Sequence, residues 1–203
     1  MERIALEELL GRPAAIARLA ETLKRGGLAA MPTETFYALA ADPRSETGVR
    51  RALAVKRRDE TKALLVLFGS RPQLADLGVA ASPQVLDRLF SIWPAPLTAV
   101  LRLETPMAAS RGAMTLGVRM PAHALLRALL RGLGPVTGTS LNRSGESPCA
   151  DAESAARLFS GELDVLVDGG RTPGGLASTL IDATREPPAV LRQGAYAWSA
   201  EGL

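Results

Sequence analysis

Short apolar runs alternate along this chain with amphipathic segments, and this pattern predicts a mixture of strands and helices. In residues 14–24, Ile16, Leu19 and Leu23 recur at helical spacing, and the glycines at positions 26 and 27 end the segment. Similar patterns predict helices at residues 45–55, 72–77, 83–90, 122–130 and 152–159. Apolar or alternating runs predict strands at residues 28–31, 64–68, 97–103, 114–120, 135–140, 164–167, 178–181 and 189–192.

Residues 36–41 are interpreted as a further helix, which Thr33, Glu34 and Thr35 would open. The free backbone N–H groups at such a helix start favour an anion, for example a carboxylate. Strands and helices alternate along the chain, with hairpin-length connections near its end. This order predicts an α/β fold of the α+β type, with a twisted sheet of mixed parallel and antiparallel strands flanked by helices.

Composition narrows the class of protein. Of the 203 residues, 47% are hydrophobic, which is ample for a core and argues against disorder. The single cysteine, Cys149, excludes an intramolecular disulfide and a cysteine zinc cluster. The N-terminus lacks a signal pattern, and no apolar run approaches the ~20 residues of a membrane span. We therefore expect a cytoplasmic protein that forms one domain over residues 1–203.

The densest cation cluster lies in residues 56–68, KRRDETKALLVLF. The chain has 24 lysines and arginines but only three lysines, and two of these, Lys56 and Lys62, fall in this segment. Cations at the mouth of a buried strand suit an anion site, and we expect Lys56 at a surface groove. The same charges would also suit the solvated end of a helix, and on charge alone that interpretation is the simpler one.

Other common chemistries find little support in the residues. The single histidine, His123, lies near a predicted helix start without a nucleophile beside it, which favours an exposed or capping role. Short polar segments follow the strands and supply cations, hydroxyls and an amide, but no poised general base. Ser140 and Asn142 alternate along the chain and would reach one ligand together. This inventory fits charge neutralisation of a phosphoanhydride better than acid–base catalysis.

Seven segments along the chain form a recognisable series. They are PTETFYALA at 32–40, KRR at 56–58 with Lys62, WPAPLTAVL at 93–101, TLGVRMPAH at 115–123, GTSLNRSGESP at 138–148, GGLASTLID at 174–182 and LRQGA at 191–195. Taken in order, they resemble the YrdC/Sua5 (TsaC) family of threonylcarbamoyl-adenylate synthases in its short, single-domain form. The resemblance covers about residues 10–195 and implies a YrdC/RibB-like fold with a basic concave groove.

The resemblance implies an activity. Members of the family convert L-threonine, bicarbonate and ATP, supplied with Mg²⁺, to threonylcarbamoyl-AMP and pyrophosphate. The product serves the formation of N6-threonylcarbamoyladenosine at position 37 of tRNA, which a transferase of the TsaD/Kae1 type completes. The resemblance thus implies a nucleotidyltransferase with ATP as substrate and no metal ligands of its own.

The resemblance also assigns site residues by motif. The catalytic set would be Lys56, Arg58, Ser140 and Asn142. ATP would be bound by Lys56, Arg58, Lys62, Thr115, Asn142 and Arg192, and threonine by Thr35, Arg119, Ser140 and Ser178. The chain departs from the family pattern at Ala38, Leu67, Ala95, Leu141 and Ala150.

Two alternatives remain open. The net charge of +3 and the pI near 9.5 would suit a non-catalytic module that binds double-stranded RNA or tRNA. The aromatic content of 4% disfavours it, because aromatic side chains stack bases. The carbamoyl-adenylate module of hydrogenase maturation proteins is a related enzymatic alternative, but those proteins also carry acylphosphatase and zinc-finger segments that this sequence lacks.

Overall fold

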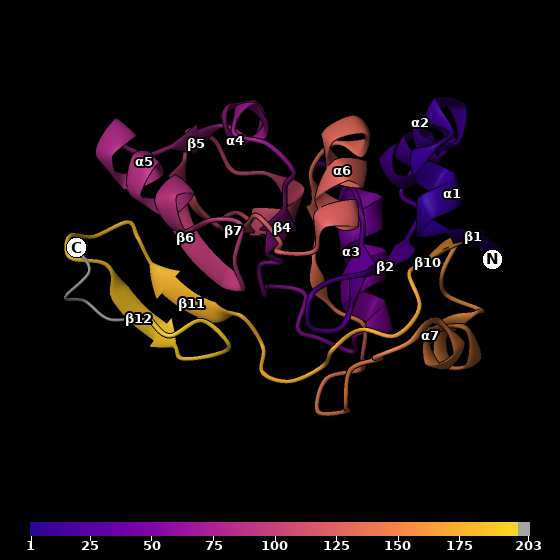
Figure 1. Ribbon diagram of the computed structural model, residues 1–203. Helices are drawn as coiled ribbons and strands as arrows, with labels where there is room; N and C mark the ends of the chain where they lie inside the picture. Colours follow the sequence, from indigo (N-terminus) through magenta and orange to yellow (C-terminus); the bar gives the residue numbers. More distant parts are fainter. Residues whose placement is uncertain (199–203) are drawn as a thin grey trace.

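Two β-sheets with helices packed around them make up the protein, as the computed structural model shows for residues 1–198 (Figure 1). The first sheet has the strand order β1-β10-β2-β3-β9. The second has the order β12-β11-β6-β7-β4-β8, with β5 paired to β6. Each sheet contains both parallel and antiparallel pairs. The predicted α/β fold with mixed strand directions is therefore confirmed.

The first sheet is covered on both faces. Its strands are β1 (Glu2–Ala5), β2 (Ala29–Pro32), β3 (Tyr37–Ala40), β9 (Thr139–Ser140) and β10 (Val165–Asp168). Consecutive residues of a strand face opposite ways, so Ala30 packs toward one core cluster and Met31 toward the other. One face lies against α1, α2 and α6, and the other against α3 and α7. The bounds of these helices are α1 (Leu6–Leu10), α2 (Pro13–Lys24), α3 (Glu46–Val55), α6 (Ala124–Leu133) and α7 (Ala152–Phe159).

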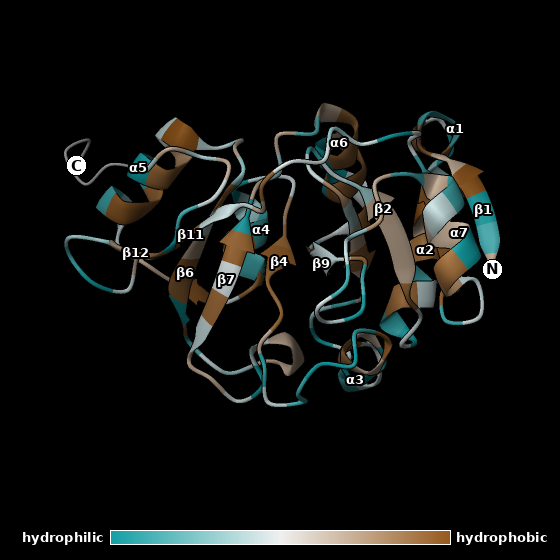
Figure 2. Ribbon diagram, turned by 90° about the horizontal axis from the view of Figure 1, so that it is seen from below, coloured by the Kyte–Doolittle hydropathy of each residue, from teal (hydrophilic) through white to brown (hydrophobic). Residues whose placement is uncertain are grey.

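The second sheet is covered by helices on one face. Its strands are β4 (Val66–Leu67), β5 (Val79–Ala80), β6 (Leu97–Leu103), β7 (Thr115–Arg119), β8 (Val136–Thr137), β11 (Thr179–Asp182) and β12 (Ala189–Arg192). The helical segments beside it are α4 (Pro72–Asp76), α5 (Pro83–Ile92) and the 3-10 turn η1 (Ala108–Ser110). On β6, Leu97, Ala99 and Leu101 enter the core, which leaves Thr98 and Val100 on the other face. Hydrophobic colouring runs along β4 and β6, whereas β1 is hydrophilic at its start and hydrophobic at its end (Figure 2).

Gly138 lies where the chain leaves the second sheet after β8 and enters the first sheet as β9. Its N–H donates to Leu65 O at 2.9 Å, so the chain passes close to the start of β4. A Cβ atom at position 138 would overlap the side chain of Leu67. A residue without a side chain is therefore needed where the two sheets approach each other.

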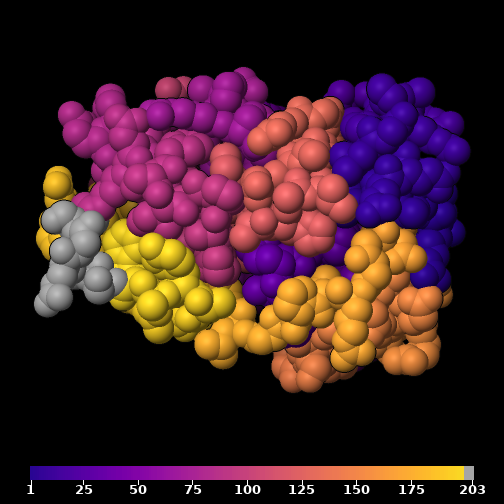
Figure 3. All heavy atoms as spheres, viewed as in Figure 1, coloured from indigo at the N-terminus to yellow at the C-terminus, as the bar shows by residue number. Residues whose placement is uncertain are grey.

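Residues 169–178 form another crossing between the sheets, from β10 to β11, along the lower edge of the molecule (Figures 1 and 3). Thr172 N and Oγ1 both donate to Ala150 O, at 2.7 and 3.0 Å. Gly174 N donates to Thr35 O at 2.7 Å. The crossing is thus fixed to the turn that follows β2.

The predicted helix at residues 36–41 is wrong. Residues Tyr37–Ala40 form the buried strand β3, which pairs with β2 and β9. Thr33 Oγ1 accepts hydrogen bonds from the N–H groups of Thr35 and Phe36, at 3.1 and 3.3 Å, which makes a side-chain-stabilised turn. Residues 33–35 therefore open no helix, and the anion site expected at a helix start there does not exist.

Several short elements escaped the sequence pattern. They are β1, α1 and β5, together with the division of residues 135–140 into β8 and β9. β1 is mostly exposed, and only two of its four residues are apolar, so it gave no clear apolar signal. Within residues 1–198, no helix has the length and apolar character needed to cross a membrane.

Candidate functional site

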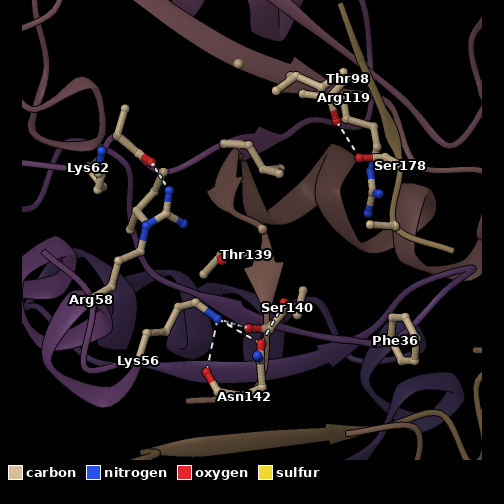
Figure 4. A pocket seen from close by; sticks show the side chains of 18 of the residues that line it. Phe36, Lys56, Arg58, Lys62, Thr98, Arg119, Thr139, Ser140, Asn142 and Ser178 are labelled. Atoms are coloured by element: carbon tan, nitrogen blue, oxygen red, sulfur yellow. Dashed lines mark hydrogen bonds between the residues drawn. The ribbon is translucent and has the colours of Figure 1, made fainter. Parts of the chain in front are cut away.

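A cavity of about 770 Å³ lies between the two sheets (Figure 4). The turn after β2, strand β9 and the loop after α3 form one side of it, and β6, β7, β11 and β12 form the other. Asp59 is the single carboxylate among its lining residues. The cationic lining residues are Lys56, Arg57, Arg58, Lys62, Arg119 and Arg192. This excess of positive charge suits a ligand with several negative charges.

Lys56 caps the C-terminus of α3 and is only 4% exposed, so the expectation of a surface groove is wrong for this residue. Its Nζ donates to Ser140 O at 2.5 Å, to Asn142 O at 3.0 Å and to Asn142 Oδ1 at 2.9 Å. Burial and the nearby charge of Arg58 lower its pKa to about 8. The ammonium therefore ties the end of α3 to the loop after β9 at the base of the cavity.

Ser140 and Asn142 lie side by side, as their alternation along the chain predicts (Figure 4). Ser140 Oγ donates to Asn142 Oδ1 at 2.7 Å. Asn142 Nδ2 donates to the carbonyl oxygens of Arg143 and Glu146, each at 2.8 Å. Leu141 between them is fully buried and anchors the loop in the core. The polar groups are thus held in fixed positions before any ligand binds.

The backbone turns at Arg57, and this turn sets the path of the basic segment that follows α3. Arg57 has φ of 48°, in the left-handed region, just after the helix cap. Arg57 N donates to Ala54 O and Arg58 N to Leu53 O, which is the hydrogen-bond pattern of a helix end usually closed by glycine. The chain then turns so that Arg57, Arg58 and Lys62 all line the cavity. The cluster is therefore both a helix end and part of a candidate anion site.

Arg119, Thr98 and Ser178 lie together in another part of the cavity (Figure 4). Thr98 Oγ1 and Ser178 Oγ are 2.9 Å apart and buried, and Arg192 donates to Ser178 O at 2.9 Å. Arg119 is 4% exposed, and its Nε is buried without a hydrogen-bond partner within residues 1–198. Burial, opposed by Glu34 and aided by Arg192, lowers the pKa of Arg119. A buried guanidinium with free donors at a cavity suits a carboxylate ligand.

Glu34 was not predicted to belong to the site. Its side chain is 14% exposed, and Oε1 lies 3.9 Å from Arg119 Nη1. Both carboxylate oxygens are buried without a hydrogen bond within the described part of the chain. Thr98 was also missed, although a lone hydroxyl residue among the apolar residues of β6 was a usable signal.

The structure gathers nine of the ten predicted site residues at the cavity. They are Thr35, Lys56, Arg58, Lys62, Arg119, Ser140, Asn142, Ser178 and Arg192. Thr115 does not line it, although it lies on the same face of β7 as Gly117 and Arg119. The roles assigned to these residues remain predictions.

The residues that depart from the family pattern have ordinary structural roles. Leu67 is fully buried beneath Gly138, and Ala150 accepts the hydrogen bonds of Thr172 through its carbonyl oxygen. Neither lines the cavity, whereas Ala38 does. His123 caps α6, where its Nδ1 accepts a hydrogen bond from Leu126 N at 3.2 Å, so the predicted capping role is confirmed.

Comparisons with known proteins give consistent matches. The family model Sua5–YciO–YrdC, described as "Telomere recombination", matches residues 21–194. A threonylcarbamoyl-AMP synthase of Thiobacillus denitrificans is 37% identical over 163 residues, which are 79% of this chain and 86% of the relative. That of Pyrococcus abyssi is 36% identical over 177 residues, 85% of this chain and 52% of the relative.

A solved structure, P. abyssi Sua5 complexed with L-threonine, is 34% identical and superposes with a TM-score of 0.80. The match covers 90% of this chain and 55% of that one. This chain therefore spans about half the length of the P. abyssi protein, and similarly 56% of a threonylcarbamoyl-AMP synthase of Bacillus subtilis.

Proposed function

We infer the function of this chain from the premise that it belongs to the Sua5–YciO–YrdC family. We propose that it is an ATP-dependent L-threonylcarbamoyladenylate synthase, a nucleotidyltransferase that acts on L-threonine, bicarbonate and ATP. The observation that carries this proposal is that one cavity holds a cation cluster in one part and, in another, a buried arginine whose Nε has no hydrogen-bond partner within residues 1–198. Relatives named threonylcarbamoyl-AMP synthase are 32–37% identical to it over matched stretches of 161–192 residues.

The cation cluster would hold the triphosphate. Arg58 and Lys62 line the cavity beyond Lys56 and supply charge to the phosphate oxygens. All three protons of Lys56 are engaged by Ser140 and Asn142, so in this arrangement it contributes charge and fixes the loop. A phosphate oxygen that accepts from Lys56 would have to replace one of these acceptors.

The other part of the cavity would hold L-threonine. Arg119 offers its free donors to the substrate carboxylate, because no described residue uses them. Ser178 and Thr98 present hydroxyl groups beside it, and Thr35 lines the wall formed by the turn after β2. These contacts would orient the amine toward the triphosphate.

The reaction then proceeds in two steps. The amine of threonine combines with the carbon of bicarbonate and water is lost, which gives a carbamate. A carbamate oxygen attacks the α-phosphorus of ATP, the bond to the β-phosphate oxygen breaks, and pyrophosphate leaves. The reacting groups are both anionic, so the cations of the cavity lower their repulsion while the hydroxyls fix their approach.

Magnesium would enter as part of the MgATP substrate. No group of three histidine, cysteine or acidic side chains gathers within residues 1–198 to hold a metal. Asp59 is the one carboxylate that lines the cavity, and its Oδ1 already accepts from Thr61 N and Oγ1. Phosphate oxygens and water suit the octahedral preference of Mg²⁺, which accordingly needs few protein ligands.

The product would pass to a tRNA threonylcarbamoyltransferase of the TsaD/Kae1 type. A carbamoyl-adenylate is a reactive mixed anhydride, so it needs a dedicated acceptor enzyme. Direct binding of tRNA to this chain belongs to the alternative function, a non-catalytic RNA-binding module, and remains a prediction.

The decisive experiment incubates the purified protein with MgATP, L-threonine and bicarbonate and identifies the product by mass. We expect threonylcarbamoyl-AMP and an equal amount of pyrophosphate, and neither when threonine or bicarbonate is omitted. ATP–pyrophosphate exchange that proceeds equally well without threonine would contradict the proposal. Tight, salt-sensitive binding of structured RNA without any nucleotide turnover would favour the RNA-binding alternative.

A further inference from the structure

Glu34 is a buried carboxylate that has no role in the reaction proposed above. It lies in the turn after β2, where the hydrogen bonds of Thr33 fix the backbone. Its oxygens make no hydrogen bond within residues 1–198, and neither is exposed to solvent. Burial of an ionised carboxylate without hydrogen bonds is costly, so nearby positive charge must stabilise it.

The nearest cation is Arg119, which belongs to the proposed threonine end of the cavity. Glu34 Oε1 lies 3.9 Å from Arg119 Nη1, which is close enough for strong attraction but too far for a hydrogen bond. Glu34 does not line the cavity, whereas Arg119 does. The carboxylate thus stands behind the guanidinium and leaves its donors available to a ligand.

The charges at this end of the cavity can be counted. Arg119 and Arg192 each contribute one positive charge, and Glu34 contributes one negative charge. His123 feels the charge of Glu34, but burial lowers its pKa and its Nδ1 accepts a hydrogen bond, so the ring is neutral. The net charge of these groups is therefore +1, enough to balance one carboxylate of a ligand.

We propose that Glu34 is a specificity-determining residue, which limits the amino-acid end of the cavity to substrates with a single carboxylate. This inference rests on the proposed function, because it takes Arg119 as the group that binds the substrate carboxylate. A second carboxylate, as in aspartate, would enter a desolvated region where Glu34 already offsets one guanidinium. Like charges in such a region repel strongly, so dicarboxylic amino acids are rejected.

The first test compares amino acids of equal shape on the unaltered protein. Asparagine and aspartate differ by one charge and hardly in size. We expect asparagine to bind at least about tenfold more tightly than aspartate in calorimetric titrations without ATP. Equal affinities would overturn the proposal, and this measurement needs neither turnover nor a variant that folds.

The second test changes Glu34 itself. Glu34→Gln keeps the shape and removes the charge, whereas Glu34→Asp keeps the charge and shortens the side chain. We expect Glu34→Gln to raise the ratio of aspartate to threonine kcat/KM by about tenfold, with the KM for ATP changed by less than about twofold. Glu34→Asp should keep the ratio of the unaltered protein.

Glu153→Gln is the matched control. It removes the carboxylate that pairs with Arg3, and neither Glu153 nor Arg3 lines the cavity. An unchanged ratio in Glu34→Gln, or equal changes in Glu34→Gln and Glu34→Asp, would assign Glu34 a purely structural role. Failure of the proposed function has a different signature, since the unaltered protein would then show no threonine-dependent pyrophosphate exchange. The binding comparison of asparagine with aspartate would still report on the charge.

Discussion

Lys56 combines two tasks that usually fall to different residues. Its ammonium is a positive charge at the base of the cavity and also the bond that joins the end of α3 to the loop of Ser140 and Asn142. Burial makes this charge sensitive to pH, because desolvation disfavours the protonated form. Arginine would keep its charge, but its planar fork differs from the compact ammonium that three converging oxygens surround.

We expect the affinity for ATP to fall as the pH rises through about 8, the pKa of Lys56 in the ligand-free protein. Above this pH the neutral amine of Lys56 no longer attracts phosphate. Below it the ammonium is charged, and the affinity for ATP is at its highest. Calorimetric titration between about pH 7 and 9.5 measures the effect. Lys56→Arg should bind ATP with little dependence on pH in this range, and an equally steep fall in that variant would assign the transition to another group.

The same shift has a consequence for stability with a definite sign. The pKa of Lys56 is lower in the folded than in the unfolded chain, so the unfolded chain binds more protons between about pH 8 and 10.5. The contribution of Lys56 to the free energy of unfolding therefore rises with pH across this window. It is smallest below about pH 8, where the ammonium is charged in both states.

Arg57 carries backbone strain at the edge of the cavity. Its left-handed conformation is one that glycine adopts freely and arginine does not. We expect Arg57→Gly to raise the free energy of unfolding by about 0.5–1 kcal/mol, measured by urea denaturation. Arg57→Ala retains the Cβ atom and should bring no such gain, so a gain in both variants would trace the effect to the loss of charge.

Among the elements, the end of α3 and the loop after β9 act as one unit. Arg143 in that loop donates to Val55 O at 2.8 Å and pairs with Glu162 at 2.7 Å, with its guanidinium over the ring of Phe159. Ser144 N donates to Lys56 O at 2.8 Å. These contacts lie outside the phosphate contacts proposed above and hold the two segments in register.

We expect Arg143→Ala to raise the KM for ATP by about tenfold and to leave the KM for threonine within about twofold, since only the proposed phosphate end loses its support. Steady-state kinetics with each substrate varied in turn measures the difference. Arg3→Ala is the matched control, because Arg3 likewise forms ion pairs, with Glu153 and Asp168, but belongs to β1. Equal increases in both KM values would indicate a general loss of structure.

The predicted elements were mostly those whose apolar periodicity extends over many residues. The helices at 14–24 and 152–159 were found for this reason. In the structure, Ser45 caps α3 and Asp151 caps α7, each through a side-chain oxygen that accepts a backbone hydrogen bond. The segment 36–41 misled, because a short, fully buried strand has no period of two and its composition also suits a helix. Side-chain hydrogen bonds of Thr33 decided the turn, and such bonds leave no periodic pattern.

The candidate site was predictable as a set of motifs but not as an arrangement. Glu34 stands in a motif that was recognised, yet its position behind Arg119 depends on how the turn after β2 meets β7. The burial of Lys56 likewise follows from the packing of its helix against the loop after β9, which sequence spacing does not reveal.

For the whole molecule, the cavity exists because the two sheets converge at Gly138. We expect Gly138→Ala to lower the free energy of unfolding by about 1–3 kcal/mol or more, because the added methyl group meets Leu67. Chemical denaturation measures the loss. Gly161→Ala is the control, since no atom lies within 4 Å of a Cβ there and its φ is not positive. Similar losses in the two variants would mean that the approach of the sheets is not the cause.

The position of Arg192 at the end of β12 determines when the cavity can form during synthesis of the protein. The cavity draws on residues from Thr33 to Arg192, so the chain must leave the ribosome at least as far as Arg192 before the walls of the cavity are complete. A nascent polypeptide that stops before β11 lacks Ser178 and Arg192 and cannot form the finished binding surface. Ligand binding therefore reports that translation has passed this point, and prematurely terminated products would remain without it.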